Sequence, residues 1–586
     1  MATKDAASDN GQLSEIASGY QFSGETLKLG VAMADGQPHP DVQVSLPMSM
    51  MNRHGLVAGA TGTGKTKTLQ HMAEQLSAQG VPVFLADMKG DLSGLAAAGE
   101  ANEKLTARTE SLGQQWTGTG FPVEFFTLGG EGTGVPIRAT VSSFGPILLS
   151  RVMELNATQE SSLQLIFHYA DQQGLELYNL ADLRAVIQFL TSPEGKEALS
   201  SLGGLSKATA GVILRELVGL EAEGMDAFFG EPEFDTQDLL RTAQDGRGII
   251  SALELSDVAS KPQLFSTFLM WLLADLFHDL PEVGDVDKPK LVFFLDEAHL
   301  LFNGASKAFL EAITQTVRLI RSKGVGIFFV TQTPKDVPAD VLGQLANRVQ
   351  HALRAFTPDD AKALKATVST FPKSGYDLEK VLTSAGIGEA VVTVMTETGA
   401  PSPVAWTRMF APESRMAPAP EAVQENTGSS PLMTKYGTVV DSYSAFEKLS
   451  GQGASDHGAE QGAGAGAGQA SGGNDDAGAP APGDENGGFR PYGEQTGWSQ
   501  DGSGQSGEGD GGQPSAADRK AAERAAREEA ARQKAEERER QKRNEAIMRV
   551  GTNVASTLGR EIVRSIFGTS SRSRRRGGGG LGGLFG

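Results

Sequence analysis

The 586-residue chain contains no cysteine, which excludes disulfides, thiolate zinc sites and cysteine nucleophiles. It also lacks a long apolar run. The most apolar stretch, Leu264–Leu280, is interrupted by Asp275 and His278 and is shorter than a usual membrane span. The first residues, MATKDAASDNGQLSE, are polar and acidic, unlike a signal peptide. We therefore expect a soluble, cytoplasmic protein without a transmembrane segment, in which Leu264–Leu280 is a buried helix.

Only 6% of the residues are aromatic, and no patch that interleaves aromatic and basic residues occurs in the first 410 residues. The net charge of −20 is unevenly spread. Residues 516–586 hold 17 Lys and Arg against 9 Asp and Glu, a net +8, so residues 1–515 carry −28. An acidic body argues against indiscriminate binding to nucleic acid. It does not exclude a narrow basic channel, because binding depends on the local charge.

Sequence patterns divide the chain into four parts. Residues 1–40 have few apolar residues in any period, which predicts a loose lead-in. Residues 41–410 alternate strand and helix patterns, typical of an α/β fold with a mostly parallel sheet, and helical periodicity over about 145–230 predicts a helical insertion. Residues 411–515, rich in Pro and then in Gly, Ser and Asp, predict a disordered acidic linker. Residues 516–586 predict a basic, charged helical tail with a Gly/Arg-rich terminus.

Within the second part, apolar runs predict strands, and the spacing between them predicts helices. The run from Gly55 to Met88 reads as strand, glycine-rich turn, helix and strand. The other expected strands are Val42–Leu46, Gly248–Leu255, Leu291–Leu295, Gly326–Thr331, His351–Phe356 and Glu389–Met395.

GATGTGKT at Gly59–Thr66 fits the phosphate-loop pattern G-x-x-x-x-G-K-[ST], and it follows an apolar strand and opens a helix. Glycines let successive backbone N–H groups turn toward phosphates, and the helix N-terminus adds a partial positive charge. Lys65 supplies a charge to the β- and γ-phosphates of ATP, and the Thr66 hydroxyl ligates Mg²⁺. The expected nucleotide-binding residues are Gly59, Ala60, Thr61, Gly62, Thr63, Gly64, Lys65, Thr66 and Lys67.

The strand at Leu291–Leu295 is uniformly apolar and is followed by two adjacent acids, Asp296 and Glu297. Asp296 is placed to hold Mg²⁺, and Glu297 is placed to orient or deprotonate the attacking water. The alternative is that both acids only cap the next helix. This alternative is less favoured, because the same chain also contains a complete phosphate loop. The two motifs together predict an ATPase.

Other polar residues follow expected strands. Gln332 ends the strand Gly326–Thr331 and could sense the γ-phosphate. Asp87 and Asp91 follow the strand after the phosphate-loop helix. They could touch Mg²⁺ or water, or serve only as turn residues.

Arg318 and Arg321 lie in the last turns of an expected helix, Ser306–Ser322. Cations are favourable at a helix C-terminus, but an arginine there could also reach a neighbouring subunit's ATP. Arg348 and Arg354 are weaker candidates for the same role.

The order GATGTGKT, FLADMKGDLSG, FFLDEAHLLF, RSKGVGIFFVTQTP and LANRVQHALR resembles the HerA–FtsK superfamily of ring-forming ATPases, specifically the bacterial HerA-like group typified by YjgR. The resemblance covers about Val42 to Phe410, and GREIVRSIFG at Gly559–Gly568 is similar to the end of that group's proteins. It implies a RecA-like P-loop NTPase core and a homo-hexameric ring. It also implies a sensor glutamine at Gln332 and an arginine finger in trans at Arg321. HerA itself carries a β-barrel before this core, whereas some fifty residues precede the loop here, so we do not expect barrel functions such as docking a nuclease.

The superfamily moves double-stranded DNA, so a DNA translocase or helicase-like motor is the leading hypothesis. Lys373 or Arg184 could then face a channel. Two alternatives stay open: an ATPase acting on protein partners or assembly, and a slow regulatory nucleotide-binding protein. Val550, Val554, Leu558, Ile562 and Ile566 recur every four residues and would form one apolar helical face, which would suit a partner helix, another subunit or an anionic surface.

Overall fold

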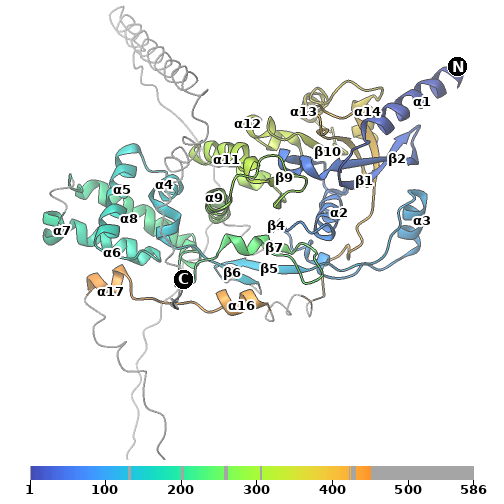
Figure 1. Cartoon of the computed structure of the whole chain (residues 1–586). Coiled ribbons are helices and arrows are strands. Elements are labelled where there is room, and N and C mark those ends of the chain that lie inside the picture. The colour runs from blue at the N-terminus through green and yellow to red at the C-terminus, as the bar shows by residue number, and fades with distance from the viewer. Residues whose placement is uncertain are drawn as a thin grey trace, which may run out of the picture. The chain divides into compact units, whose positions relative to one another are not determined.

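The computed structural model describes residues 2–129, 134–198, 203–255, 262–303, 307–420, 423 and 430–450. Its centre is a 12-stranded sheet in the order β2-β1-β12-β11-β10-β3-β9-β8-β4-β7-β5-β6 (Figure 1). The strands are β1 (Thr26–Ala34), β2 (Gln37–Pro47), β3 (Gly55–Ala58), β4 (Val83–Asp87), β5 (Val123–Leu128), β6 (Val135–Ile137), β7 (Ile250–Glu254), β8 (Leu291–Leu295), β9 (Val325–Thr331), β10 (Asn347–His351), β11 (Glu389–Thr393) and β12 (Ala405–Met409).

Strand direction divides the sheet into two parts. From β10 to β6 every neighbouring pair is parallel. From β2 to β10 every pair is antiparallel. The predicted α/β fold with a mostly parallel sheet is confirmed. Parallel strands end at the same edge of a sheet, so the segments that follow β3, β4, β8, β9 and β10 come together there.

The parallel strands are buried on both faces, which explains their uninterrupted apolar sequences. In β8, Phe293 packs into one core with α9 (Pro262–Asp279), α11 (Lys307–Ile320) and the helical insertion. Its neighbour Phe294 points the other way, into a second core that includes α2 (Lys65–Ala78). The remaining helices of the ATPase body are short: α3 (Glu103–Ser111), α10 (His299–Phe302), α12 (Ala339–Leu342), α13 (Pro358–Val368) and α14 (Leu378–Ser384).

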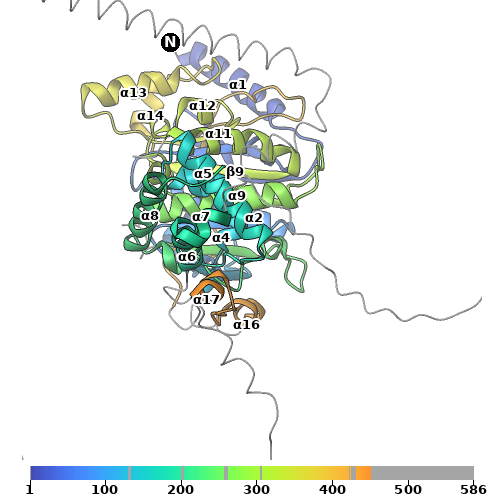
Figure 2. The ribbon, with the colours of Figure 1, turned by 90° about the vertical axis from the view of Figure 1, so that its left-hand side faces the viewer.

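Helices occupy the segment expected to be an insertion: α4 (Val141–Val152), α5 (Ala157–Gln172), α6 (Leu180–Thr191), α7 (Pro193–Ala198) and α8 (Lys207–Ala222). They gather at the β6 end of the sheet, and Figure 2 views them from that side. α5 and α6 begin with capping boxes built on Asn156 and Asn179. Their apolar sides, such as Leu163 and Leu183, join the core shared with α9. No helix in the described ranges combines the length and apolar character needed to cross a membrane.

The predicted loose lead-in over residues 1–40 is wrong. α1 (Ala2–Gly19), β1 and the start of β2 lie there, and Leu27, Leu29 and Val31 are fully buried. β1 pairs with β12, about 380 residues later in the chain, with Gly30 opposite Met409. The alternation of Leu27, Leu29, Val31 and Met33 was the available signal for this strand.

The predicted linker over residues 411–515 is wrong for its first 40 residues where the structure describes them. Residues 411–420, the clamp segment, lie on α2: Glu74 accepts hydrogen bonds from the backbone N–H groups of Glu413 and Ser414 at 2.8 and 2.9 Å. Gln70 donates to the Arg415 carbonyl at 2.9 Å. Residues 430–450, the strap, contain α16 (Pro431–Tyr436) and α17 (Ala445–Ser450), which pack on β6 and α6. Residues 451–515 and the predicted tail at 516–586 lie outside the described residues.

One strand is displaced from its expected position. The prediction placed a strand at His351–Phe356, whereas β10 covers Asn347–His351. Its sequence, NRVQH, is mostly polar, yet four of its five residues are buried because it lies between β3 and β11. Apolar content therefore failed to locate this strand.

Candidate nucleotide site

The phosphate loop joins β3 to α2. β3 is fully buried and ends at Ala58, and α2 begins at Lys65. Gly59, Gly62 and Gly64 have φ angles of 155°, 78° and 115°, a region that side chains disfavour. A Cβ on Gly59 would lie 2.5 Å from the Cβ of His351, so no larger residue fits there. The result is a cradle at a helix N-terminus, the form that binds phosphates.

Backbone hydrogen bonds tie this loop to three neighbouring strands. The Gly59 N–H donates to Thr331 of β9 at 3.2 Å, and the Ala60 N–H donates to Ala352, just after β10, at 2.8 Å. The Gly388 N–H, just before β11, donates to the Thr63 carbonyl at 2.9 Å. The loop is therefore positioned by the sheet on both sides.

His351 supports the cradle from behind. Its imidazole is fully buried, with Nε2 3.0 Å from the Thr68 hydroxyl and Nδ1 2.9 Å from the Glu389 carbonyl. Burial lowers its pKa to about 4, so the ring is neutral at pH 7. A neutral ring between α2 and β11 acts as a spacer and adds no charge beside the phosphates.

The Lys65 side chain folds back over the loop, where Nζ lies 3.4 Å from the Ala60 carbonyl. Only 8% of the residue is exposed. Burial lowers the pKa of Lys65, and the charges of Glu297 and Asp296 oppose that shift. The lysine of the loop and the acid pair after β8 thus lie within electrostatic reach of each other.

Asp296 and Glu297 follow β8 at the carboxyl edge of the sheet, and both are buried. Oδ1 of Asp296 accepts a hydrogen bond from the Glu297 N–H at 2.9 Å. Burial raises the pKa of Asp296 to about 7. Within the described part of the chain, Oδ2 of Asp296 and Oε2 of Glu297 have no hydrogen-bond partner. Two buried, unsatisfied carboxylate oxygens at this edge call for a cation or a water.

Lys89 is a site residue that sequence reasoning missed. Its ammonium group pairs with Oε1 of Glu297. Burial raises the pKa of Glu297, but the ion pair with Lys89 outweighs that effect, so the pKa is lowered. Nδ1 of His299 lies 3.3 Å from the other oxygen, Oε2. Lys89 follows β4, which lies next to β8, so its position between the two acids of ADMKGD was the available signal.

Asp87 acts as a turn residue in this structure. Its carboxylate accepts hydrogen bonds from the backbone N–H groups of Lys89, Gly90 and Leu92 at 3.1, 2.8 and 2.9 Å. Burial raises its pKa, and these hydrogen bonds oppose the shift. The carboxylate thereby fixes the loop that carries Lys89.

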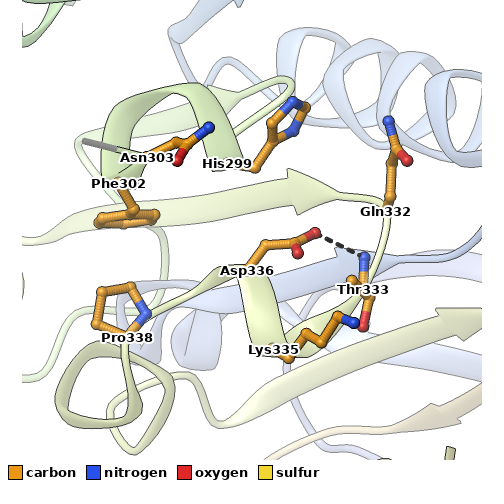
Figure 3. A pocket seen from close by; sticks show the side chains of 8 residues that line it. All are labelled: His299, Phe302, Asn303, Gln332, Thr333, Lys335, Asp336 and Pro338. Carbon is orange, nitrogen blue, oxygen red and sulfur yellow. Dashed lines mark hydrogen bonds between the residues drawn. The ribbon is translucent and has the colours of Figure 1, made fainter. Parts of the chain in front are cut away.

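Gln332 follows β9 and is exposed between two hollows. One hollow, of about 480 Å³, is lined by His299 and Phe302 of α10, by Asn303 just after it, and by the Gln332–Pro338 segment (Figure 3). The other, of about 400 Å³, is lined by Ala60 and Thr61 of the phosphate loop together with Gln332. Gln332 therefore stands between the phosphate loop and the helix that follows the acid pair.

The four arginines that the sequence analysis named as candidates lie at different places in the structure. Arg321 lies in a single 3-10 turn (Arg321–Lys323) before β9, at the edge opposite the phosphate loop. Burial and the charge of Arg53 lower its pKa. Arg318 is exposed on α11, whereas Arg354 lines the hollow beside Thr61. The Nε of Arg348 donates to the Leu345 carbonyl at 3.3 Å.

The two candidate channel residues also differ. Lys373 is exposed, whereas Arg184 pairs with Glu221 inside the helical insertion.

No group of three or more His, Asp or Glu side chains suited to hold a metal occurs in the described ranges. In proteins, Mg²⁺ is usually bound by one or two carboxylates together with substrate phosphates and several waters. Thr66 in the first turn of α2 and the free oxygen of Asp296 offer the ligands that such an ion takes from protein. The residues present fit a Mg²⁺–nucleotide.

Comparisons with known proteins place this geometry in a family. The family described as helicase HerA-like C-terminal matches residues 33–488. The DNA double-strand break repair helicase HerA of Saccharolobus solfataricus is 22% identical over 356 residues, 60% of this chain and 64% of that protein. A probable HerA of Methanocaldococcus jannaschii is 36% identical over 109 residues, 18% of this chain and 20% of that protein. The matched parts thus span less than two thirds of either relative.

Among solved structures, the plasmid coupling protein TrwB in complex with ADP and Mg²⁺ is 15% identical with a TM-score of 0.45, covering 68% of this chain and 97% of that one. The family match extends over most of the chain, from within β1 to beyond the last described residue. The chain belongs to the helicase HerA-like C-terminal family.

Proposed function

We propose that this protein binds ATP with Mg²⁺ and hydrolyses it at the carboxyl edge of β3 and β8. The observation that carries the proposal is that the phosphate loop after β3 and two buried, partly unsatisfied carboxylates after β8, Asp296 and Glu297, lie at the same edge of the parallel sheet. A structural acid pair would have its oxygens satisfied by helix N–H groups. Here, among the described residues, one oxygen of the pair accepts a backbone N–H bond, and its donor, Glu297, lies before the helix.

Each residue has a role in that reaction. The amides of Gly59–Thr66 and the Lys67 N–H surround the phosphates, and the Lys65 ammonium neutralises the β- and γ-phosphates. Thr66 and Asp296 would hold Mg²⁺, which would supply charge neutralisation for the phosphates. Glu297 takes a proton from the attacking water, and Gln332 responds to the γ-phosphate from the next strand. The Lys89 ion pair keeps Glu297 ionised and ready to act as a base.

The family and the named helicase relatives support a further proposal: ATP turnover drives movement along duplex DNA in a homo-hexameric ring. We expect duplex DNA to raise the ATPase rate severalfold at about 50 mM salt and to lose this effect near 200 mM, because phosphate contacts weaken steeply with salt. The measurement is steady-state phosphate release with and without duplex DNA across that salt range. The Glu297→Gln variant controls for contaminating ATPase. A rate that ignores duplex DNA at low salt would refute the DNA proposal and leave the ATPase proposal standing.

We also propose that Arg321 acts on the ATP of an adjacent subunit. β9 separates Arg321 from its own phosphate loop by seven residues, roughly 23 Å at the rise of a strand, which is too far for its own γ-phosphate. In a head-to-tail ring this edge would face a neighbour's site.

Mixing Arg321→Ala chains with Lys65→Ala chains tests this role, since each is expected to be nearly inactive alone. An Arg321→Ala subunit keeps its phosphate loop and can receive Arg321 from a Lys65→Ala neighbour, so part of the activity should return. The measurement is ATPase rate against mixing ratio, with mixed rings verified by native mass spectrometry. Arg318→Ala is the matched control and should neither lose nor restore activity in this way. Verified mixed rings without any recovery would contradict the role in trans.

A further inference from the structure

The turn Gly386–Gly388, between α14 and β11, lies against the phosphate loop. The Gly388 N–H donates to the Thr63 carbonyl at 2.9 Å, and a Cβ on Gly64 would lie 3.2 Å from the Gly388 nitrogen. Because β11 runs antiparallel to β10, the turn before β11 lies at the same edge of the sheet as the segments that follow β3 and β10. The turn therefore belongs to the surroundings of the nucleotide site.

Hydrogen bonds and an ion pair fix the conformation of this turn. The Glu389 carboxylate accepts a hydrogen bond from the Gly386 N–H at 3.0 Å and pairs with Arg408 of β12 at 2.7 Å. Arg108 of α3 donates to the Gly388 carbonyl at 3.1 Å. Gly388 itself has a φ of 73°, a conformation that residues with side chains disfavour. The residue at the centre of the turn is therefore held in a defined position.

That central residue is Ile387, and its side chain faces solvent. Ile387 is 72% exposed, and of the large apolar residues exposed in the described ranges only Phe356 has a higher exposed fraction, 85%. Single exposed apolar residues are common on protein surfaces, so exposure alone indicates nothing. The position of Ile387, on a fixed turn that is hydrogen-bonded to the phosphate loop, is what points to a ligand.

The order of the strands determines which way a nucleotide would lie across the loop. The acid pair follows β8 and Gln332 follows β9, so the γ-phosphate faces the β9 side of β3. The nucleoside is at the other end of the triphosphate and extends toward β10 and β11, the side on which Ile387 lies. The turn also contacts Thr63 and Gly64, the half of the loop that leads into α2.

Phe356 is the rival candidate for contact with the nucleoside. It lines the hollow of about 400 Å³ together with Ala60, Thr61 and Gln332. Ala60 and Thr61 form the first half of the phosphate loop, and Gln332 lies on the γ-phosphate side. This hollow therefore adjoins the wrong end of the triphosphate, and the geometry favours Ile387.

We propose that Ile387 is the contact surface for the purine base of the bound nucleotide, an inference that rests on the ATP site proposed above. The base packs its apolar face on the Ile387 side chain, which removes both surfaces from water. Nη1 of Arg408 lies 3.5 Å from the Ile387 carbonyl and brings beside it a planar guanidinium, a group that stacks on aromatic rings. The contact is the same before and during hydrolysis, so it contributes affinity and leaves the chemical step unchanged.

Ile387→Ser in the full chain tests this contact, because it removes the apolar surface without adding charge. We expect the KM for ATP to rise roughly tenfold, equivalent to about 1.4 kcal/mol, with kcat unchanged. Equilibrium titration in the Glu297→Gln background, where hydrolysis is slow, should show the same change in Kd. Ile387→Leu keeps an apolar surface and should retain the wild-type KM. Val218→Ser is the matched control, since Val218 is 56% exposed on α8, and it should change neither constant.

Inorganic tripolyphosphate with Mg²⁺ separates the base from the phosphates. It has no base, so its inhibition constant should be the same for the wild type and for Ile387→Ser. An equal rise in this constant would overturn the proposal, because the substitution would then act through the phosphate loop. So would an unchanged KM and Kd for ATP in Ile387→Ser.

Phe356→Ser tests the rival position. A tenfold loss of ATP affinity in Phe356→Ser but not in Ile387→Ser would place the base in the hollow beside Thr61 and overturn the proposal. A wild-type chain that binds neither ATP nor tripolyphosphate would refute the nucleotide site itself, a result that differs from each of the others.

Discussion

The Glu297→Gln protein should bind ATP and Mg²⁺ almost normally and hydrolyse ATP roughly 10²–10⁴ times more slowly, the effect of losing a general base. Glutamine has the same shape and can still accept a hydrogen bond from Lys89 in place of the ion pair. Its backbone φ of 46° stays available, so the fold is retained. The substitution therefore removes a proton acceptor and little else.

Single-turnover hydrolysis and equilibrium binding of a fluorescent ATP analogue together measure this effect. The control is Glu254→Gln, because Glu254 ends β7 at the same edge of the sheet, and it should leave the rate largely unchanged. If Glu297→Gln fails to bind ATP, the residue has a structural role and the mechanism proposed above is wrong.

Lys65→Ala should abolish productive nucleotide binding. Removing one partner of a buried charge pair costs about 2–5 kcal/mol, or roughly 30- to several thousand-fold in Kd. The fold should persist, because the hydrogen bond from the Lys65 ammonium to the Ala60 carbonyl is long, at 3.4 Å, and burial already disfavours the charge of Lys65. A charged residue in a loop is expected to face solvent, but the Lys65 side chain is buried.

Isothermal titration with ATP and Mg²⁺ measures the loss, and thermal unfolding reports on the fold. Lys104→Ala, an exposed lysine on α3, is the matched control and should bind ATP normally. If Lys65→Ala hydrolysed ATP at the wild-type rate, the phosphate loop would not be part of the site that hydrolyses ATP.

The parts of the site that sequence predicted are those fixed by local chain geometry. A glycine loop between a strand and a helix, and two acids after a buried strand, are determined within ten or so residues of chain. β8 was predicted with its observed bounds, Leu291–Leu295, since a strand buried on both faces has an unbroken apolar sequence.

The parts that sequence missed depend on partners far away in the chain. Lys89 joins the site only because β4 lies beside β8 in the sheet. β1 is a strand because β12 is available to pair with it. The composition of the clamp segment predicted disorder. In the structure, backbone N–H groups of the clamp segment donate to the buried carboxylate of Glu74. The amino-acid composition of residues 411–420 carries no information about this distant acceptor.

The clamp segment and the strap also bear on where the ATPase can be cut. Protein chemists would place a domain boundary near Phe410, where the last strand has just ended and proline becomes frequent. A recombinant fragment that stops there would leave the buried Glu74 carboxylate without its amide donors and would expose the core residues against which Leu432 and Tyr436 pack. A fragment that ends at Ser450 keeps both, so expression vectors for crystallography or cryo-microscopy should carry the chain to that residue.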